Sequence, residues 1–310
     1  MSAAGMAAGA GAGPGAAARR QAFIERLTGM GFALPAFLLL LLLHIVPLVV
    51  LGVLSLTDYQ FGALSFSFIG LDNFAAALKD ETFRRSLGNT FRYVAIVVPG
   101  SVVFGLLLAI LVHGRGRSRG IYEVIFFLPV TATLIAMASV WKFLLHPTLG
   151  PINAFIVMLG FQPVNFLSDP AWALPTLAVI GVWQLVGFNM VLFLAGLSTI
   201  PKDLYEAADM DGAAGGVDRF LTVTWPRLGP TTMFVVITSS ITAFKVFDTV
   251  VAMTRGAPQG STEVILYVMY LEGFQYFNTA YAAALTLVFL AFILVFSGVQ
   301  TYFIDRKVHY

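Results

Sequence analysis

The sequence NTFRYVAIVVPGSVVFGLLLAILV, from Asn89 to Val112, is mostly apolar and carries one charged residue, Arg92, near its start. A helix needs about 20 mostly apolar residues to cross about 30 Å of hydrocarbon, because each residue adds about 1.5 Å along its axis. This stretch is long enough, so we predict that it forms a membrane-spanning helix.

Five further stretches have the same character: Gly31–Leu56, Ile121–Leu145, Trp172–Leu197, Thr231–Ala252 and Ala280–Ile304. Of the 310 residues, 58% are hydrophobic and only 11% are charged, whereas soluble domains carry about 25% charged residues. The mean hydropathy is +0.86. We therefore predict an all-α integral membrane bundle of six transmembrane helices.

The distribution of positive charge predicts the orientation, since Lys and Arg in short loops tend to stay cytoplasmic. With the N-terminus inside, eleven of the eighteen Lys and Arg residues fall in cytoplasmic segments. We therefore predict a cytoplasmic N-terminal tail at 1–30, a six-helix membrane domain at 31–304 and a cytoplasmic C-terminal tail at 305–310. The N-terminal tail is low in complexity and then amphipathic. Its Ala/Gly-rich residues 1–18 are expected to be disordered rather than a cleaved signal.

The composition also limits the chemistry. The chain has no cysteine and four scattered histidines, so it has neither thiolate metal ligands nor a zinc motif with paired histidines. A P-loop for ATP needs a lysine directly after a glycine, and none of the lysines follows one. We predict no catalytic residue, no metal site and no cofactor in this chain.

Three small residues, Ser101, Gly105 and Ala109, are spaced four apart within the stretch quoted above. In a helix they share one face, and small faces let membrane helices approach closely. The pattern indicates a packing seam, although chance explains it equally well in a chain rich in Ala and Gly.

The segment PKDLYEAADMDGAAGGVDRFLTVTWPRLGP, at 201–230, separates the fourth and fifth predicted spans. We expect Ser198 or Thr199 to cap a first short helix, and Gly212 is a typical helix stop. Helical spacing from Val217 to Thr224 predicts a second helix. We interpret the segment as two amphipathic helices on the cytoplasmic face that dock a soluble partner.

Part of this segment resembles a known family motif. The run EAADMDGA, followed by a proline after TVTW, resembles the EAA loop of the permease subunits of binding-protein-dependent ABC importers. In that family the loop forms a coupling helix seated in a cleft of the ATPase subunit. The resemblance implies that six residues couple this chain to an ATPase: Glu206, Ala207, Ala208, Asp211, Gly212 and Pro226.

Other segments are similar to the carbohydrate-uptake branch of that family, the sugar permeases related to the maltose transporter. They are FIGLDNFAAAL from Phe68, LPVTATLIAMASVWKFLLHPTLGPIN from Leu128, FDTVVAMTRGAP from Phe247 and STEVILYVMYLEGF from Ser261. The resemblance extends over most of the chain. It implies the permease subunit of an importer for a sugar or sugar-like solute, a subunit that is not itself an enzyme.

The same resemblance implies the partners and the location. They are two ATPase subunits that bind ATP and Mg, a second related permease chain, an extracytoplasmic solute-binding protein and the lipid of the bacterial inner membrane, with no nucleic acid. The residues leave open which sugar, polyol or glycerol phosphate is carried, and which of the two permeases holds the main substrate site.

Polar and aromatic residues of the fourth and fifth predicted spans suit a sugar, which is bound by hydrogen bonds and aromatic faces. The candidates for the translocation pathway are Trp183, Gln184, Asn189, Thr238 and Thr242. The alternative is that they hold helices together, as Asn, Gln and Thr do in membranes.

Lys245 and Asp248 complete the candidate pathway. They are three residues apart, and we expect an ion pair on one helix near the outer end of the fifth span. A charge inside the membrane costs about 2.5–3.5 kcal/mol, so it is usually paired or faces water. The pair serves either the pathway or only the structure.

Two other classes of protein compete with this interpretation. An integral membrane lipid-modifying enzyme would gather His, Asp or Glu at one membrane face, and no such cluster is visible in the sequence. An ion-coupled secondary transporter would usually carry more spans, often as paired repeats, and would not need the EAA loop.

Overall fold

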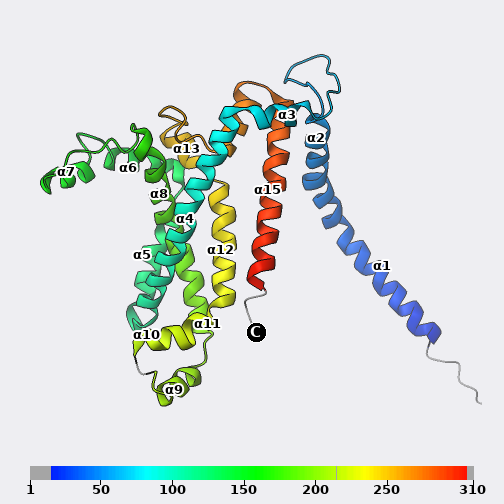
Figure 1. Ribbon diagram of the computed structural model, residues 1–310. Coiled ribbons are helices and arrows are strands. Elements are labelled where there is room, and N and C mark those ends of the chain that lie inside the picture. Colours follow the sequence, from blue (N-terminus) through cyan, green and yellow to red (C-terminus); the bar gives the residue numbers. More distant parts are fainter. Residues whose placement is uncertain (1–14, 214, 306–310) are drawn as a thin grey trace, which may run out of the picture. The chain divides into compact units, whose positions relative to one another are not determined.

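The computed structural model describes residues 15–213 and 215–305, and these residues are mostly helical (Figure 1). No strand forms within them, and the β-bridge they contain pairs Thr57 with Phe68. The all-α prediction is thus confirmed for this part of the chain. Most of the predicted N-terminal and C-terminal tails, residues 1–14 and 306–310, lies outside the described residues.

The chain divides into two compact units, residues 1–53 and 54–310. The first unit is a continuous helical stretch: α1 (Gly15–Leu40), a π-helical turn (Leu41–Ile45) and α2 (Val46–Leu54). Because α1 begins at Gly15, the expected disorder of residues 1–18 is wrong for the last four of them. Three of those four are alanines, and alanine has the highest helix propensity.

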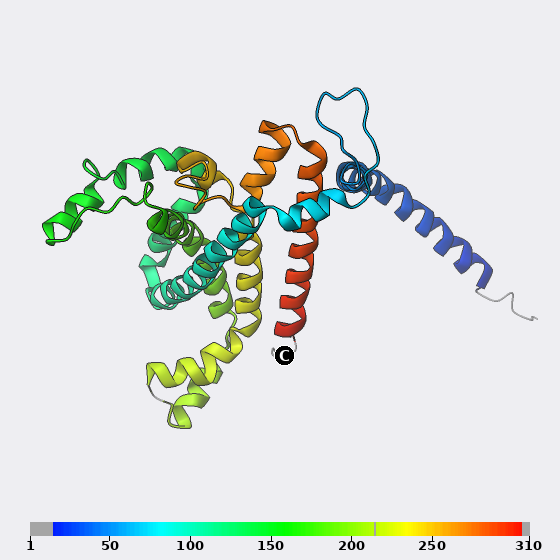
Figure 2. The ribbon, with the colours of Figure 1, turned by 45° about the horizontal axis from the view of Figure 1, so that its top comes forward.

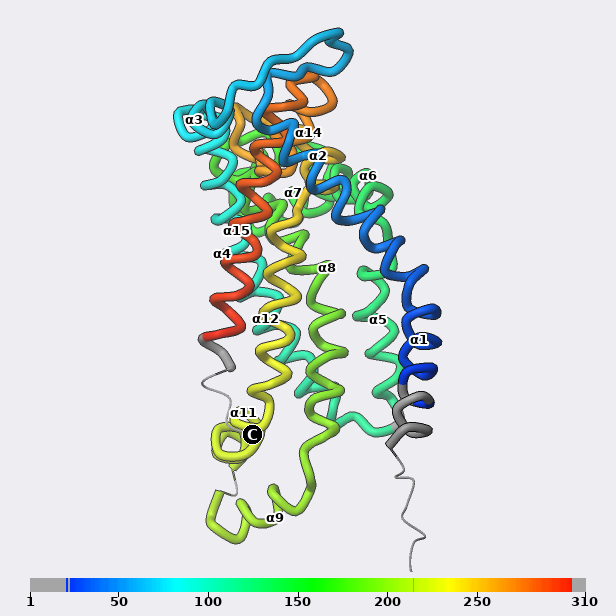
Figure 3. The backbone as a smooth tube through the Cα atoms, turned by 90° about the vertical axis from the view of Figure 1, so that its right-hand side faces the viewer, coloured from blue at the N-terminus to red at the C-terminus, as the bar shows by residue number. Residues whose placement is uncertain are grey.

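The second unit contains the remaining helices, several of which lie side by side (Figure 3). They are α3 (Asp72–Lys79), α4 (Glu81–His113), α5 (Arg119–Thr131), α6 (Leu134–Leu144), α7 (Pro151–Met158), α8 (Pro170–Ser198), α9 (Lys202–Met210), α10 (Gly216–Arg219), α11 (Trp225–Arg227), α12 (Gly229–Phe244), α13 (Asp248–Met253), α14 (Ile265–Tyr270) and α15 (Thr279–Asp305). Helices α9 to α11 lie at one end of this unit, and α13 and α14 lie at the other (Figure 2).

Four helical stretches among the described residues are long and apolar enough to cross a membrane. They are Phe23–Leu54, Glu81–His113, Pro170–Ser198 and Thr279–Tyr302. These stretches coincide with the first, second, fourth and sixth predicted spans, so the membrane character predicted from the sequence is confirmed for them.

The third and fifth predicted spans are not single helices. Helices α5 and α6 meet at an angle of 99°, because Ala132 and Thr133 adopt extended backbone between them. Pro129 has already removed an intrahelical donor in the last turn of α5. Helix α12 has only 16 residues, and the chain leaves the helical path before α13 begins at Asp248.

The centre of the second unit is the contact between α4 and α8, with α12 packed against both. Ser101 and Ala109 are fully buried on α4. Between them lies Gly105, where an added Cβ would stand 2.7 Å from Cβ of Asn189 on α8. The face formed by these three small residues is therefore a packing seam, as predicted, and not a chance pattern.

The seam predicts the effect of a bulky residue. Gly105→Val should lower the stability of the chain by about 1–3 kcal/mol, the usual effect of overpacking, because α8 would have to move away from α4. Thermal unfolding in detergent measures this loss. Gly88→Val is the control, since a Cβ there meets no atom within 4 Å. Equal melting temperatures for the two variants would contradict the seam.

Candidate functional site

A polar cavity of about 300 Å³ lies between α4, α8, the start of α6 and the break between α12 and α13. Its polar lining residues are Tyr93, Gln184, Thr242, Lys245, Asp248 and Thr249. Residues of α4 and α8 form one wall, and the residues that follow α12 form the other. The cavity lies at the place where α12 stops, and residues 245–249, which follow that helix, line it.

Four of the seven candidate pathway residues line this one cavity: Gln184, Thr242, Lys245 and Asp248. They come from two predicted spans that are about 60 residues apart in the chain. Lys245 and Asp248 are exposed, so their charges remain accessible within a polar space. This set offers an ammonium group, a carboxylate, an amide and a hydroxyl, which can donate to and accept from a hydroxyl-rich ligand.

The other three candidates do not line the cavity and have packing partners instead. Trp183 meets Trp141 edge to face, with ring centroids 5.2 Å apart. Asn189 is fully buried and is paired with Ser239 of α12, its Nδ2 donating to Oγ at 3.0 Å and its Oδ1 accepting from Oγ at 3.1 Å. The hydroxyl of Thr238 donates to the carbonyl of Phe234 in its own helix.

The predicted ion pair between Lys245 and Asp248 is wrong. Lys245 is the residue directly after α12 and Asp248 is the first residue of α13, so they do not share a helix. The residue between them that breaks the path is Phe247, with φ −149° and ψ −57°. The ion pairs found in the described part of the chain involve neither residue.

Two polar residues of the cavity wall, Tyr93 and Thr249, were not predicted from the sequence. Tyr93 fits against Gly181 of α8, where an added Cβ would lie 2.3 Å from the tyrosine hydroxyl. A large residue opposite a glycine is a signal that becomes visible only when α4 and α8 are placed together. Thr249 follows the helix break, which the apolar run of the fifth predicted span concealed.

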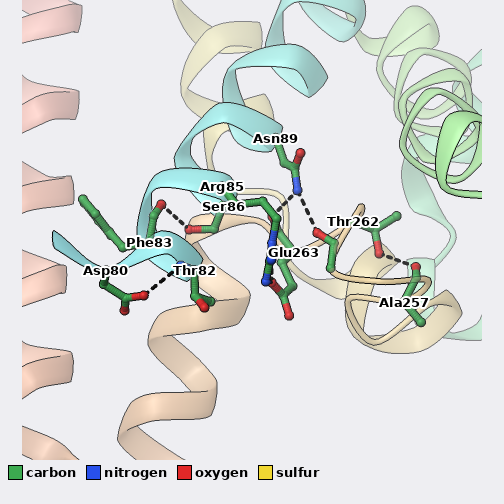
Figure 4. A network of polar contacts seen from close by, with 10 residues as sticks. Asp80, Thr82, Phe83, Arg85, Ser86, Asn89, Ala257, Thr262 and Glu263 are labelled. Atoms are coloured by element: carbon green, nitrogen blue, oxygen red, sulfur yellow. Dashed lines mark hydrogen bonds and ion pairs between the residues drawn. The ribbon is translucent and has the colours of Figure 1, made fainter. Parts of the chain in front are cut away.

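A polar network fastens the loop between α13 and α14 to the start of α4 (Figure 4). The side-chain amide of Asn89 donates to the carbonyls of Gly260 and Glu263, both at 3.0 Å. Thr90 accepts from the backbone N–H of Ile265 at 3.0 Å. Glu263 also forms an ion pair with Arg85 at 2.6 Å. The loop is therefore held to the helix that forms one wall of the cavity.

Hydrogen bonding within the loop adds to this anchorage. The hydroxyl of Thr262 is buried and lies 2.8 Å both from Oγ1 of Thr254 and from the carbonyl of Ala257. Gly260 has φ +74°, and a Cβ there would stand 2.6 Å from Nε of Arg85. Only glycine lets the loop lie this close to the arginine.

We expect Asn89→Leu to loosen this loop. It leaves the carbonyls of Gly260 and Glu263 without their donor, and each unpaired buried group costs about 1–3 kcal/mol. Backbone amides of residues 256–265 should then exchange with deuterium at least about fivefold faster. Arg85→Gln is the control, because its ion pair is partly exposed and such pairs contribute about 0–1 kcal/mol. Unchanged exchange in Asn89→Leu would mean that other contacts hold the loop.

At the opposite end, the segment at 201–230 folds back on itself (Figure 1). Helix α9 ends in a glycine turn: Gly212 has φ +92°, and Ala213 N–H donates to the carbonyl of Ala208 at 2.9 Å. The predicted helix stop is thus confirmed. The predicted cap is wrong, since Pro201 precedes α9 and the hydroxyls of Ser198 and Thr199 bond back into α8.

Contacts between α9 and the following helices fix the orientation of α9. Arg219 of α10 forms an ion pair with Asp209 of α9, with Nε 2.5 Å from Oδ1. The hydroxyl of Tyr205 lies 3.1 Å from that of Thr224. Leu204 and Ala208 also pack toward the core near Leu228. The residues on the other side of α9 are left exposed.

The six residues on the motif have different environments. Ala208 is half-buried against the core side. The remaining five are exposed: Glu206, Ala207, Asp211, Gly212 and Pro226. Met210, beside them, is 89% exposed. Small, acidic and apolar groups are thus exposed on α9 and just after it, while contacts on the other side of α9 hold the helix in place.

Comparisons with known proteins agree with each other. The family described as the binding-protein-dependent transport system inner membrane component matches residues 101–309. The chain is 32% identical to the sn-glycerol-3-phosphate transport system permease protein UgpA of Agrobacterium fabrum, over 83% of this chain and 87% of that protein. It is 33% identical to the probable ABC transporter permease protein YesP of Bacillus subtilis, over 87% of each chain.

A solved structure shows the same fold. A chain of a bacterial ABC transporter that imports the acidic polysaccharide alginate superimposes with a TM-score of 0.81 at 22% identity, covering 94% of this chain and 100% of that chain. At this identity the similarity concerns the fold alone.

Proposed function

Because this chain belongs to the family of binding-protein-dependent transport system inner membrane components, we propose that it carries a sugar or sugar-like solute as one permease subunit of an ATP-binding-cassette importer. Members of this family are multi-pass transport subunits and not enzymes. By its name, UgpA belongs to a transport system for sn-glycerol 3-phosphate, and the structural neighbour imports an acidic polysaccharide. Both ligands are rich in oxygen atoms that can accept hydrogen bonds from the donors that line the polar cavity.

The proposal includes the membrane arrangement. Six spans cross the inner membrane of the bacterial cell, the third as the bent pair α5 and α6 and the fifth as α12 with α13. Both termini and the α9–α11 segment face the cytoplasm. The concentration of Lys and Arg in the segments at that end supports this orientation.

The observation that carries the proposal is the connection between the two ends of the second unit. The α9–α11 segment is inserted between α8 and α12. These helices also supply Gln184 and Thr242 to the cavity. Midway, the buried pair of Asn189 and Ser239 ties α8 to α12. A push on α9 would therefore move both helices, and with them two sides of the cavity.

The assembly follows from the family and from the missing P-loop. Two ATPase subunits bind ATP and Mg and receive α9 through Glu206, Ala207, Ala208, Asp211, Gly212 and Pro226. A second, related permease completes the pathway, and an extracytoplasmic solute-binding protein delivers the solute at the end where the cavity lies. A second solved structure that shares the fold of this chain is a bacterial alginate ABC transporter in complex with a periplasmic protein that holds an alginate pentasaccharide, which supports this last partner.

The coupling role is tested by Gly212→Asp. An L-residue at φ +92° is strained by about 1–2 kcal/mol, and the added carboxylate places a further negative charge next to Asp211 in the chain, so the end of α9 should no longer fit its partner. ATP-dependent uptake of a radiolabelled solute, in vesicles containing the complete importer, should fall about tenfold, equivalent to about 1.4 kcal/mol.

Gly216→Asp is the matched control, because Gly216 is exposed in the same segment and a Cβ there meets no atom within 4 Å. Uptake by this variant should stay near wild type. Uptake that needs neither ATP nor an intact Gly212 would instead favour an ion-coupled carrier.

The cavity is tested separately by Gln184→Ala, Lys245→Ala and Asp248→Ala. Each variant removes a group able to hydrogen-bond the solute, so uptake at low solute concentration should fall about fivefold for a loss of about 1 kcal/mol. Assembly with the ATPase should be unchanged, since the cavity lies at the break before α13, and α13 is at the opposite end of the second unit from α9 (Figure 2). Thr238→Val is the control, as Thr238 does not line the cavity. If only the control lost uptake, the cavity would not be the pathway.

A further inference from the structure

A smaller cavity of about 140 Å³ lies where α4 ends and α5 begins. This turn is at the same end of the second unit as α9 to α11 (Figure 1). Four of the residues that line the cavity are apolar: Leu108, Leu111, Val112 and Phe126. The other two, Arg115 and Tyr122, are polar. None of the six belongs to the proposed coupling surface or to the proposed solute pathway.

The lining is apolar in one part and polar in another, an arrangement that suits an amphiphilic ligand. On the α4 side, Leu108, Leu111, Val112 and Arg115 follow the spacing i, i+3, i+4 and i+7, which places them along one helical face. The arginine comes last, in the turn just beyond the end of the helix. The facing wall is formed by Tyr122 and Phe126, one turn apart on α5. This cavity, called the slot below, is thus apolar along the helices and cationic where Arg115 lies.

The two polar groups of this slot lack partners among the described residues. The guanidinium of Arg115 takes part in none of the ion pairs found there, whereas Arg119, one turn further on, is paired with Glu123 at 2.6 Å. Hydrogen bonds at Arg115 involve its backbone N–H and its carbonyl. The side chain of Tyr122 is 37% exposed. A donor pair of this kind suits a phosphate group.

We infer that this slot binds one anionic phospholipid, with its phosphate on Arg115 and Tyr122 and part of one acyl chain along Leu108, Leu111 and Phe126. A free phosphate would leave the apolar wall uncovered, and a lipid without a phosphate would leave the arginine unpaired. A zwitterionic phospholipid would bring its own cationic group beside Arg115, whereas an anionic one would not. Basic pockets between transmembrane helices on the cytoplasmic side bind anionic head groups. Such a lipid would join the end of α4 to the start of α5, beside the bent third span.

Native mass spectrometry of the full-length chain in mild detergent tests the inference. Titration with phosphatidylglycerol should show one bound lipid that phosphatidylcholine at equal concentration does not replace. Arg115→Ala should weaken this binding about fivefold, corresponding to about 1 kcal/mol for one basic residue near a membrane surface. Tyr122→Phe should weaken it less. Arg227→Ala is the control, since it removes an exposed arginine at the same end that does not line this cavity.

A second variant separates the lipid from other sources of phosphate. Leu111→Trp fills the apolar part of the slot from an exposed position, where the side chain is 60% exposed, and keeps Arg115. It should abolish binding of phosphatidylglycerol with no loss of thermal stability in lipid-free detergent. Displacement of the lipid by inorganic phosphate, equal binding of phosphatidylcholine, or full binding by Arg115→Ala or Leu111→Trp would each overturn the inference.

Discussion

The close approach of α4 and α8 at Gly105 is the constraint on which the second unit depends. Lipid is as apolar as a leucine side chain, so hydrophobic burial gives membrane helices little reason to associate, and close packing and hydrogen bonds take its place. Gly105 leaves room for Asn189, and Asn189 then reaches Ser239 on α12. Three helices are fixed relative to one another by one small residue and one buried polar pair. A larger residue at this point would separate the helices that shape the cavity.

The break after α12 differs from the contact at Gly105. At Gly105 two regular helices pack closely, whereas after α12 the helix itself is interrupted. Lys245 and Asp248 would lie on one helical face in an unbroken span and could pair with each other. With the chain turned at Phe247, each charge faces the cavity separately. The loop that follows is then fastened to α4 through Asn89 and Thr90, so the irregular backbone is satisfied by side chains where it leaves the helix.

The other end of this unit combines a rigid support with an exposed surface. Asp209 pairs with Arg219, and Tyr205 pairs with Thr224. These two contacts tie α9 to the residues that follow its glycine turn. In the neighbouring turn between α4 and α5, the guanidinium of Arg115 forms none of the ion pairs found among the described residues. In the proposed orientation, the exposed side of α9 would contact the ATPase subunit. The turn between α4 and α5, which carries Arg115, would contact a lipid.

The family, the helical class, four helices long and apolar enough to cross a membrane, and the stop at Gly212 could all be predicted from the amino-acid sequence. Each depends on residues that are neighbours along the chain: an apolar run of sufficient length, a glycine after a helix, or a short motif. The two broken spans were missed because Pro129 and Phe247 lie inside apolar runs that hydropathy cannot divide. Which polar residues share the cavity was decided by tertiary structure alone. Gln184 and Thr242 both line the cavity, while Asn189, on the same helix as Gln184, is buried in the core. The helices packed against α8, and not the sequence of α8 itself, decide which of its faces lines the cavity.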